Sequence, residues 1–194
     1  MRKHTRCHTL LVRCATALLA IATCGSAVKA TTLMRMSVAE LSHAAQVIVR
    51  AHCVSNSTRW DANEIWTFTA FSVDEVWRGS PAPQIMVRLL GGRSGNLTSH
   101  VSGIPRFRPG EDVVLFLAPT RHGDFSVVSW EQGTFRIRHG IHAGGETVLQ
   151  DTASFATFDP ATREFETQGI RDMPLVVFRA QVEASLHGGA GRTP

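Results

Sequence analysis

The stretch Glu64–Trp77, with the sequence EIWTFTAFSVDEVW, decides the fold class of this chain of 194 residues. Residues of high β propensity run through it with a period of two. One set comprises Ile65, Thr67, Thr69, Phe71 and Val73, and the alternating set comprises Trp66, Phe68, Ala70 and Ser72. Because successive side chains of a strand point to opposite faces, the pattern predicts one strand that ends at Arg78-Gly79-Ser80-Pro81. A strand of fourteen residues is longer than a flat sandwich needs, so we expect it to bend strongly.

Further strands and two helices are predicted on both sides of this stretch. The strands span residues 46–54, 84–90, 112–118, 125–130, 134–139 and 145–150. A capping box of Ser37 and Glu40 opens a helix over 38–45, and Pro174 opens a helix with an apolar stripe that runs to about Leu186. We interpret residues 91–109 as one long loop, 151–172 as a polar connection and 188–194 as a disordered tail.

These elements predict one mainly β domain over residues 31–187. A long bent strand that belongs to two sheets is characteristic of five-stranded Greek-key barrels of the oligonucleotide/oligosaccharide-binding (OB) type. The expected fold is therefore an OB-like barrel with a short N-terminal helix and a C-terminal helix. No later segment is long and apolar enough to span a membrane.

The first thirty residues have the composition of a secretory signal peptide. Arg2, Lys3 and Arg6 form a positive start, Cys14–Cys24 is apolar, and Val28-Lys29-Ala30 predicts cleavage after Ala30. Cleavage after Ala27 is a second possible site. One alternative to a signal peptide is an N-terminal anchor helix, but such a helix needs about 20 apolar residues. The other alternative is a lipoprotein with the lipid on Cys24, which would mark a structural envelope protein. The chain is therefore expected to be secreted or periplasmic.

Removal of this leader changes the charge and the cysteine content. The remainder carries 15 arginines against 16 acids, a net charge of −1, which argues against a nucleic-acid partner held by net charge. It retains only Cys53, so no internal disulfide is expected. Cys53 alternates with Val47, Val49 and Ala51, which predicts a buried thiol that faces away from His52.

The order of segments resembles the netrin-module and tissue-inhibitor-of-metalloproteinase barrel. The matching stretches are AAQVIVRAHCV, FTAFSVDEVWRG, QIMVRLL, PGEDVVLFLA and FSVVSWEQGTFRI, which together lie within Ser42–Ile137. The chain also resembles a group of uncharacterised secreted bacterial proteins. The resemblance implies the barrel. In the inhibitors a mature N-terminal cysteine chelates the protease zinc and disulfides staple the barrel, whereas here Thr31 is the predicted first residue and Cys53 stands alone.

Catalytic and metal-binding motifs are scarce. The zinc-protease motif His-Glu-x-x-His is absent, and the loop Gly91-Gly92-Arg93-Ser94-Gly95 lacks the spacing of a nucleophile elbow. His139 and His142, with Glu146 nearby, would need a further ligand to hold a metal, so we interpret them as a solvated turn. Asp61 and Glu64 are paired acids of a loop. We expect no catalytic residue, no cofactor and no metal site.

Two Arg-apolar-Arg motifs suggest binding instead. Arg106-Phe107-Arg108 lies in the long loop, where the arginines would pair with carboxylate or sulfate groups and Phe107 would stack on a sugar or an aromatic ring. The alternative is that Phe107 plugs the barrel. Arg136-Ile137-Arg138 is interpreted as a charged outer strand face, with both arginines pointing outward and with Phe135 and Ile137 inside. The candidate binding residues are Arg93, Arg106, Phe107 and Arg108.

The sequence thus predicts a non-catalytic binding module whose partner is an extracytoplasmic protein or glycan. One alternative is a protease inhibitor that acts through its N-terminal edge. Another is a hydrolase with a site built from loop residues such as Asp61, Ser94 and His100.

Overall fold

The computed structural model describes residues 32–140, 145–152, 156–160, 162–166 and 169–188, all within the unit Thr31–Pro194. The predicted leader, and so the cleavage sites and Thr31, lie outside the described residues. The elements are β1 (Thr32–Met34), α2 (Val38–Ala44), β2 (Val47–Asp61), β3 (Glu64–Arg78), β4 (Gln84–Leu90), β5 (Gly92–Ser94), β6 (Leu97–Ser99), β7 (Asp112–Pro119), β8 (Phe125–Val127), the 3-10 helix η1 (Trp130–Gly133), β9 (Thr134–His139), β10 (Glu146–Leu149), β11 (Ala156–Asp159), β12 (Glu164–Glu166), β13 (Met173–Pro174) and α3 (Leu175–Gly188).

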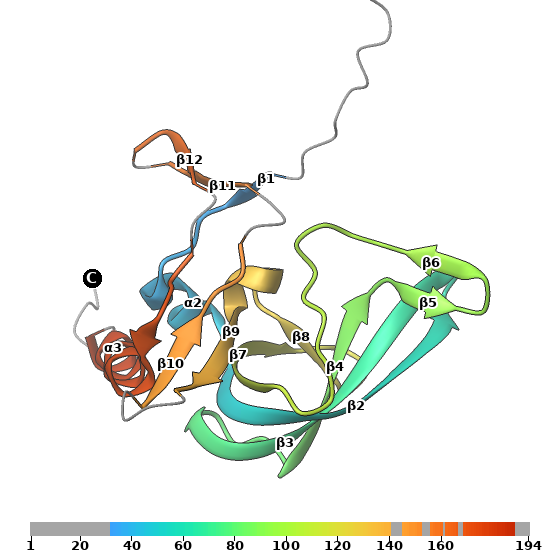
Figure 1. Cartoon of the computed structure of the whole chain (residues 1–194), viewed down its shortest axis with the longest axis horizontal. Helices are drawn as coiled ribbons and strands as arrows, with labels where there is room; N and C mark the ends of the chain where they lie inside the picture. Colours follow the sequence, from blue (N-terminus) through green and yellow to red (C-terminus); the bar gives the residue numbers. More distant parts are fainter. Residues whose placement is uncertain (1–31, 141–144, 153–155, 161, 167–168, 189–194) are drawn as a thin grey trace, which may run out of the picture. The chain divides into compact units, whose positions relative to one another are not determined.

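Five strands close into a barrel. They are hydrogen-bonded in the order β7-β2-β3-β4-β8, and β8 pairs a second time with β7 (Figure 1). The β4–β8 pair is parallel and rests on one residue pair, Val87 with Phe125, whereas the other pairs of the ring are antiparallel. A closed five-stranded Greek-key barrel is the predicted fold class, which the structure confirms. β9, β10 and β13 extend the same sheet from β7.

The bend of the two longest strands makes closure feasible. The β2–β3 ladder slips in register between Ile48 and Val49, between Arg50 and Ala51, and between Cys53 and Ser55. Such bulges increase local twist and curve a strand. β2 therefore pairs with β7 over residues 47–52 and continues beyond that sheet with β3 as a long hairpin, as Figure 1 shows.

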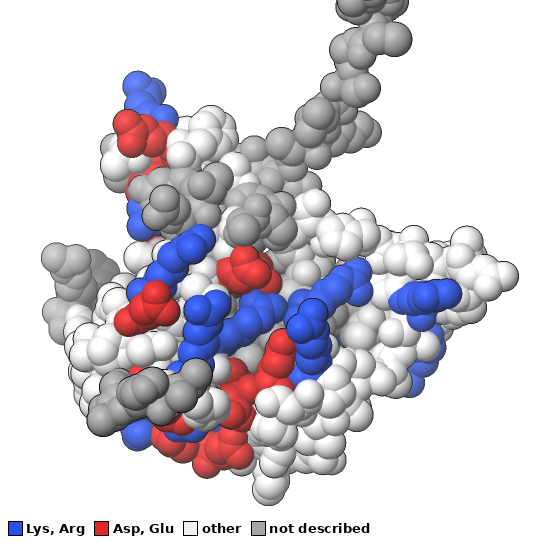
Figure 2. Space-filling view, in the orientation of Figure 1, with Lys and Arg blue, Asp and Glu red and all other residues white. Residues whose placement is uncertain are grey.

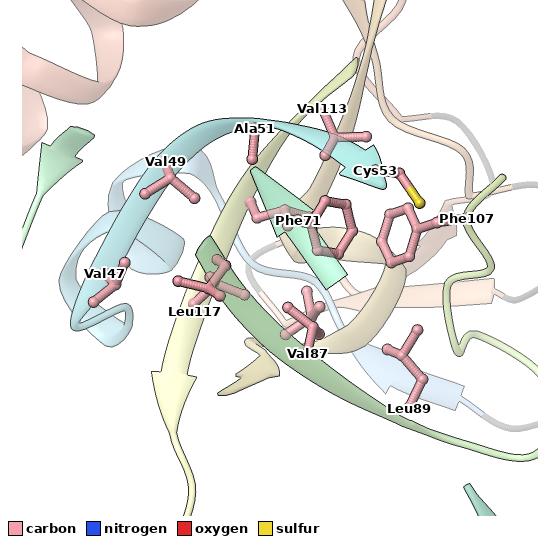
Figure 3. Packing of buried hydrophobic residues seen from close by; sticks show 13 residues of the cluster. Val47, Val49, Ala51, Cys53, Phe71, Val87, Leu89, Phe107, Val113 and Leu117 are labelled. Carbon is pink, nitrogen blue, oxygen red and sulfur yellow. The ribbon is translucent and has the colours of Figure 1, made fainter. Parts of the chain in front are cut away.

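Alternation along β2 and β7 separates two hydrophobic cores. The barrel interior holds the buried side chains Val47, Val49, Ala51, Cys53, Phe71, Val87, Leu89, Phe107, Val113, Leu115 and Leu117, most of them drawn in Figure 3. Ile48, Val114 and Phe116 face the other way and pack in a second core with both helices. This explains why 112–118 reads as apolar on both faces.

Both predicted helices exist, and both pack on the second core. The capping box that opens α2 is formed, with the Ser37 backbone N donating to Glu40 Oε2 at 2.7 Å. α3 buries Leu175, Phe178 and Val182 on that core. The predicted helix from 174 to about 186 thus differs from α3 only at its ends.

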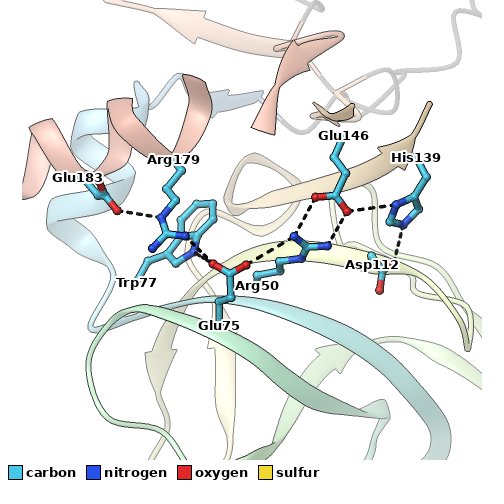
Figure 4. Close-up of polar contacts among 8 residues, drawn as sticks. All are labelled: Arg50, Glu75, Trp77, Asp112, His139, Glu146, Arg179 and Glu183. Carbon is cyan, nitrogen blue, oxygen red and sulfur yellow. Dashed lines mark hydrogen bonds and ion pairs between the residues drawn. The ribbon is translucent and has the colours of Figure 1, made fainter. Parts of the chain in front are cut away.

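A chain of ion pairs also connects α3 to the barrel (Figure 4). Arg179 Nη1 lies 2.7 Å from Glu75 Oε2, and Glu75 Oε1 lies 3.6 Å from Arg50 Nη1. Arg50 Nη2 continues to Glu146 Oε1 at 2.6 Å, and His139 joins Glu146 to Asp112. The chain links α3 to β3, β2, β10, β9 and β7, and its exposed members contribute little stability each.

Several predicted segments were wrong. Residues 91–109 are not one loop, because β5 and β6 form a small hairpin within them. Residues 151–172 are not only a connection, because β11 pairs with β12 and with β1. The strand predicted over 46–54 runs on to Asp61, and that predicted over 125–130 stops at Val127. A strand of three or four residues is too short for its hydrophobic periodicity to be recognised, and a strand of polar residues has no hydrophobic periodicity.

Candidate binding groove

Three of the four candidate binding residues line one cavity. Arg93 comes from β5, and Arg106 and Phe107 come from the segment that joins β6 to β7. Thr58 and Thr67, from the β2–β3 hairpin, line the same cavity of about 190 Å³. We call it the arginine chamber. Arg108 does not line it: its side chain is exposed, and its backbone N donates to Glu111 Oε2 at 3.0 Å.

Phe107 fills the barrel interior. It is 6% exposed, and its ring meets the ring of Phe71 edge-on with the centroids 5.0 Å apart. Its carbonyl oxygen accepts a hydrogen bond from Asn56 Nδ2 at 2.8 Å. The structure therefore favours the alternative in which Phe107 plugs the barrel, because a buried ring offers no free face for a ligand.

The two arginines of the chamber contact backbone oxygens. Arg106 Nη2 donates to the carbonyl of Ser99 at 3.1 Å, and Arg93 Nε donates to the carbonyl of Gly95 at 3.4 Å. Within the described part of the chain, neither guanidinium forms an ion pair with a carboxylate. Arginine keeps its charge at any physiological pH, so the chamber carries positive charge.

A second, larger cavity adjoins the first. We call it the tryptophan chamber: its volume is about 500 Å³, and Trp66, Arg88, Thr120, Arg121, His122 and Trp130 line it. It shares Leu89, Leu90, Ile104 and Pro105 with the arginine chamber. The two chambers are therefore neighbours around the end of β4, and we refer to them together as the groove. Sequence reasoning missed Trp66 and Trp130 as site residues, because both lay in predicted strands.

Arg88 organises the tryptophan chamber, and carboxylates compensate its own charge. Its Nη2 lies 2.9 Å from Asp61 Oδ2, and its Nε lies 2.9 Å from Asp124 Oδ2, although the latter contact lacks the alignment of a hydrogen bond. The guanidinium also lies 4.8 Å from the ring centre of Trp66 and 5.3 Å from that of Phe68. Two carboxylates therefore compensate Arg88, which holds Trp66 beside the turn after β7.

Trp130 is held in an unusual backbone conformation. Ser129 and Trp130 have φ values of +50° and +57°, in the left-handed region that bulky residues avoid. Hydrogen bonds from Gln132 N to Ser129 O at 3.1 Å and from Glu131 N to Gly103 O at 2.9 Å surround the strained pair. Such strain costs about 1–3 kcal/mol per residue and is found preferentially at ligand-binding sites. It makes the Trp130 side of the groove a candidate site in its own right.

The two Arg-apolar-Arg motifs lie side by side. Arg136 Nη2 donates to the carbonyl of Arg106 at 3.1 Å, and basic side chains gather over β9 and the β6–β7 segment in Figure 2. Phe135 and Ile137 are buried and Arg138 is exposed, as predicted. Arg136, which was expected to point outward, has a side chain that is only 20% exposed, and its Nη1 lies 3.1 Å from the buried Glu131.

The histidines on β2 and β9 bracket one carboxylate. His52 Nδ1 lies 2.8 Å from Asp112 Oδ1, and His139 Nε2 lies 2.6 Å from Asp112 Oδ2. Burial works against ionisation of Asp112, but hydrogen bonds from both histidines outweigh it and lower its pKa. Among the described residues no group of three or more His, Cys, Asp and Glu side chains has the arrangement of a metal site. His142 lies outside that part.

The residues of the hydrolase alternative do not meet. Asp61 ends β2 and pairs with Arg88, Ser94 lies on β5, and His100 follows β6 with an exposed side chain. No hydrogen bond or ion pair joins these three described residues. Asp61 and Glu64 were expected to be loop acids, and this was wrong: they face each other at the ends of β2 and β3. Cys53 is fully buried, as predicted, and His52 faces solvent.

No protein-family model matches the chain, and no curated protein matches it. The resemblance to the netrin and inhibitor barrels therefore stays a prediction. Within the described ranges, no helix has the length and apolar character needed to cross a membrane.

Proposed function

We propose that this protein is a non-catalytic binding module that acts in the periplasm or outside the cell and holds a glycan in the groove. One observation carries the proposal: the half-buried Trp66 and Trp130 line the same chamber. That chamber lies on β3, β4 and the β7–β8 turn. In chain order these are the second and third strands of the five-stranded ring and the loop between its fourth and fifth strands. OB barrels bind oligosaccharides and oligonucleotides on this face.

The composition of the chamber suits a sugar. A sugar ring has apolar C–H faces that pack on an indole, and hydroxyl groups that need hydrogen-bond partners at its edge. Trp66 and Trp130 supply the first, and Thr120, His122 and Ser126 supply the second. A volume of about 500 Å³ lies within the range of small-molecule sites. A stable protein–protein interface would instead bury about 800 Å² of this surface.

Export is supported by the composition of the first thirty residues, which is typical of a secretory signal. The resemblance to secreted netrin-type barrels agrees with it. A protease inhibitor that acts through its N-terminal edge remains the alternative proposal, and its decisive residue, Thr31, lies outside the described part of the chain.

Replacing the tryptophans tests the proposal. Trp66→Ala and Trp130→Phe should each weaken oligosaccharide binding about tenfold or more, measured by calorimetry and by quenching of tryptophan fluorescence. Trp60→Ala is the matched control, because Trp60 is 52% exposed near the tip of the β2–β3 hairpin and lines neither chamber. Thermal unfolding of each variant separates lost binding from lost fold.

Equal affinities of Trp60→Ala, Trp66→Ala and Trp130→Phe would place the ligand elsewhere. If the protein binds no oligosaccharide in a broad panel of acidic and neutral ones, the proposed function itself is contradicted.

A further inference from the structure

We propose that the arginine chamber binds an anionic substituent, a carboxylate or a sulfate, on the glycan that occupies the tryptophan chamber. The inference rests on the proposed function and narrows it from glycans in general to acidic glycans. Arg93 and Arg106 are the residues that make the selection.

The distribution of charge favours an anion in the arginine chamber. Asp61 and Asp124 both pair with Arg88, so neither carboxylate compensates the arginine chamber. Arg93 and Arg106 contact only carbonyl oxygens in the part of the chain that the structure describes. A carboxylate or sulfate entering the arginine chamber would therefore meet two uncompensated guanidinium groups.

The neutral polar groups of the chamber are already engaged. Thr67 Oγ1 donates to the carbonyl of Gly91 at 2.7 Å and lies 3.2 Å from Thr58 Oγ1. Asn56 Nδ2 donates to the carbonyl of Phe107. A guanidinium has five N–H donors, and Arg106 uses one of them within the described residues. The donors that remain for a ligand are therefore mainly charged ones.

The backbone allows Arg106 to lie against the floor of the chamber. Gly91 has φ of +90°, and a Cβ atom there would come within 3.3 Å of Arg106 Nη2 and 2.7 Å of the Ser99 carbonyl oxygen. Only glycine, which has no Cβ atom, can adopt this positive φ at such close range to Arg106 and Ser99 without strain. The guanidinium is thus placed by the Ser99 carbonyl and the glycine surface, which limits the side-chain entropy lost when it binds an anion.

An acidic glycan fits the whole groove better than an oligonucleotide does. The chambers share Leu89, Leu90, Ile104 and Pro105, so an oligosaccharide with one ring on the tryptophans would extend past these residues to bring a charged substituent to the arginines. A nucleic acid would carry a phosphate at every unit along its whole length. The net charge of −1 over residues 31–194 gives no long-range attraction for such a polyanion.

The test compares the affinities of acidic and neutral oligosaccharides for three proteins. The probes are oligogalacturonate, a sulfated heparin oligosaccharide, maltohexaose and oligodeoxythymidylate. The proteins are the unchanged chain, Arg93→Gln/Arg106→Gln, and Arg108→Gln. Arg108 is the matched control because it is exposed, flanks Phe107 as Arg106 does, and lies outside the chamber.

The unchanged protein should bind at least one acidic probe about tenfold or more tightly than maltohexaose, and added salt should weaken that binding. The double variant should lose this preference and retain maltohexaose binding, while Arg108→Gln should keep both. Arg93→Gln alone, on an exposed side chain, provides the same readout if the double variant unfolds.

Three results would overturn the inference. They are equal affinity for acidic and neutral probes, an equal loss in Arg108→Gln, or tighter binding of oligodeoxythymidylate than of either acidic sugar. Each of these leaves glycan binding at the tryptophans intact. Absence of binding to every oligosaccharide would instead overturn the proposed function, and this inference with it.

Discussion

Cys53 shows how a single side chain reports on the barrel. It is fully buried beside Phe107 in the interior, and burial, followed by the charge of Glu111, raises the pKa of its thiol to about 11 (Figure 3). Thiolate is the reactive form, so at neutral pH the native protein should react very slowly with an aromatic disulfide reagent. Labelling should become fast only in denaturant. Fast labelling of the native state would contradict the assignment of Cys53 to the core.

Glu131 is the residue through which pH should act on stability from inside the fold. Its carboxyl group is buried, and burial raises its pKa from 4.5 to about 7 against the opposing charge of Arg136. The folded protein therefore holds this proton more tightly than the unfolded chain does. The contribution of Glu131 to the free energy of unfolding is present below about pH 4.5 and is lost as pH rises through about 7.

Glu131→Gln should remove this loss. The amide keeps a hydrogen bond to Arg136 without a charge to bury, so the variant should equal or exceed the parent in stability at about pH 8, by up to about 3 kcal/mol. Urea unfolding at about pH 5 and about pH 8 measures the difference. The assignment is wrong if the variant loses the same free energy at both pH values.

At the scale of the element, the β2–β3 turn is the weakest local match between sequence and conformation. Ala62 and Asn63 have φ values of +48° and +67°, as a two-residue hairpin turn requires. Asparagine tolerates this region but alanine does not. Ala62→Gly should therefore raise the free energy of unfolding by about 0.5–1 kcal/mol. Asn63→Gly is the control, and a gain confined to it would refute the turn assignment.

α3 depends on one aromatic side chain. Phe178 is buried, and its ring centre lies 4.4 Å from that of Phe135 and 6.3 Å from that of Phe116. Phe178→Ala should cost about 3–5 kcal/mol of unfolding free energy, because it leaves a cavity in the second core. The neighbouring Val177, 52% exposed, should cost less than about 0.5 kcal/mol when changed to alanine. Similar losses in both variants would mean that α3 packs differently.

At the scale of the whole molecule, the prediction concerns processing. The exported protein should begin at Thr31, or less often at Val28, because small residues precede both positions and a short apolar segment precedes them. N-terminal sequencing of the exported protein decides the site. A chain that starts at Met1, or that carries lipid on Cys24, would contradict the signal-peptide interpretation.

Most of the barrel could be predicted from residue patterns, because strand alternation and helix capping are local. The period of two in β3 and β2, the doubly apolar β7 and the Ser37–Glu40 capping box each arise from residues a few positions apart. Burial of Cys53 followed from the same alternation. By contrast, β1, β11 and β12 are too short for any period, and their pairing joins opposite ends of the domain.

The groove could not be predicted, because it arises from register and closure rather than from pattern. Trp66 and Trp130 come from distant segments, and they line one cavity only in the closed barrel, in which β8 pairs with β4 at Val87 and Phe125. Arg93 and Arg106 were suspected from composition, but only the tertiary structure separates Arg106 from Arg108 and buries Phe107 between them. Alternation decides which face a side chain takes, whereas the curvature of the sheet decides which other side chains it meets there.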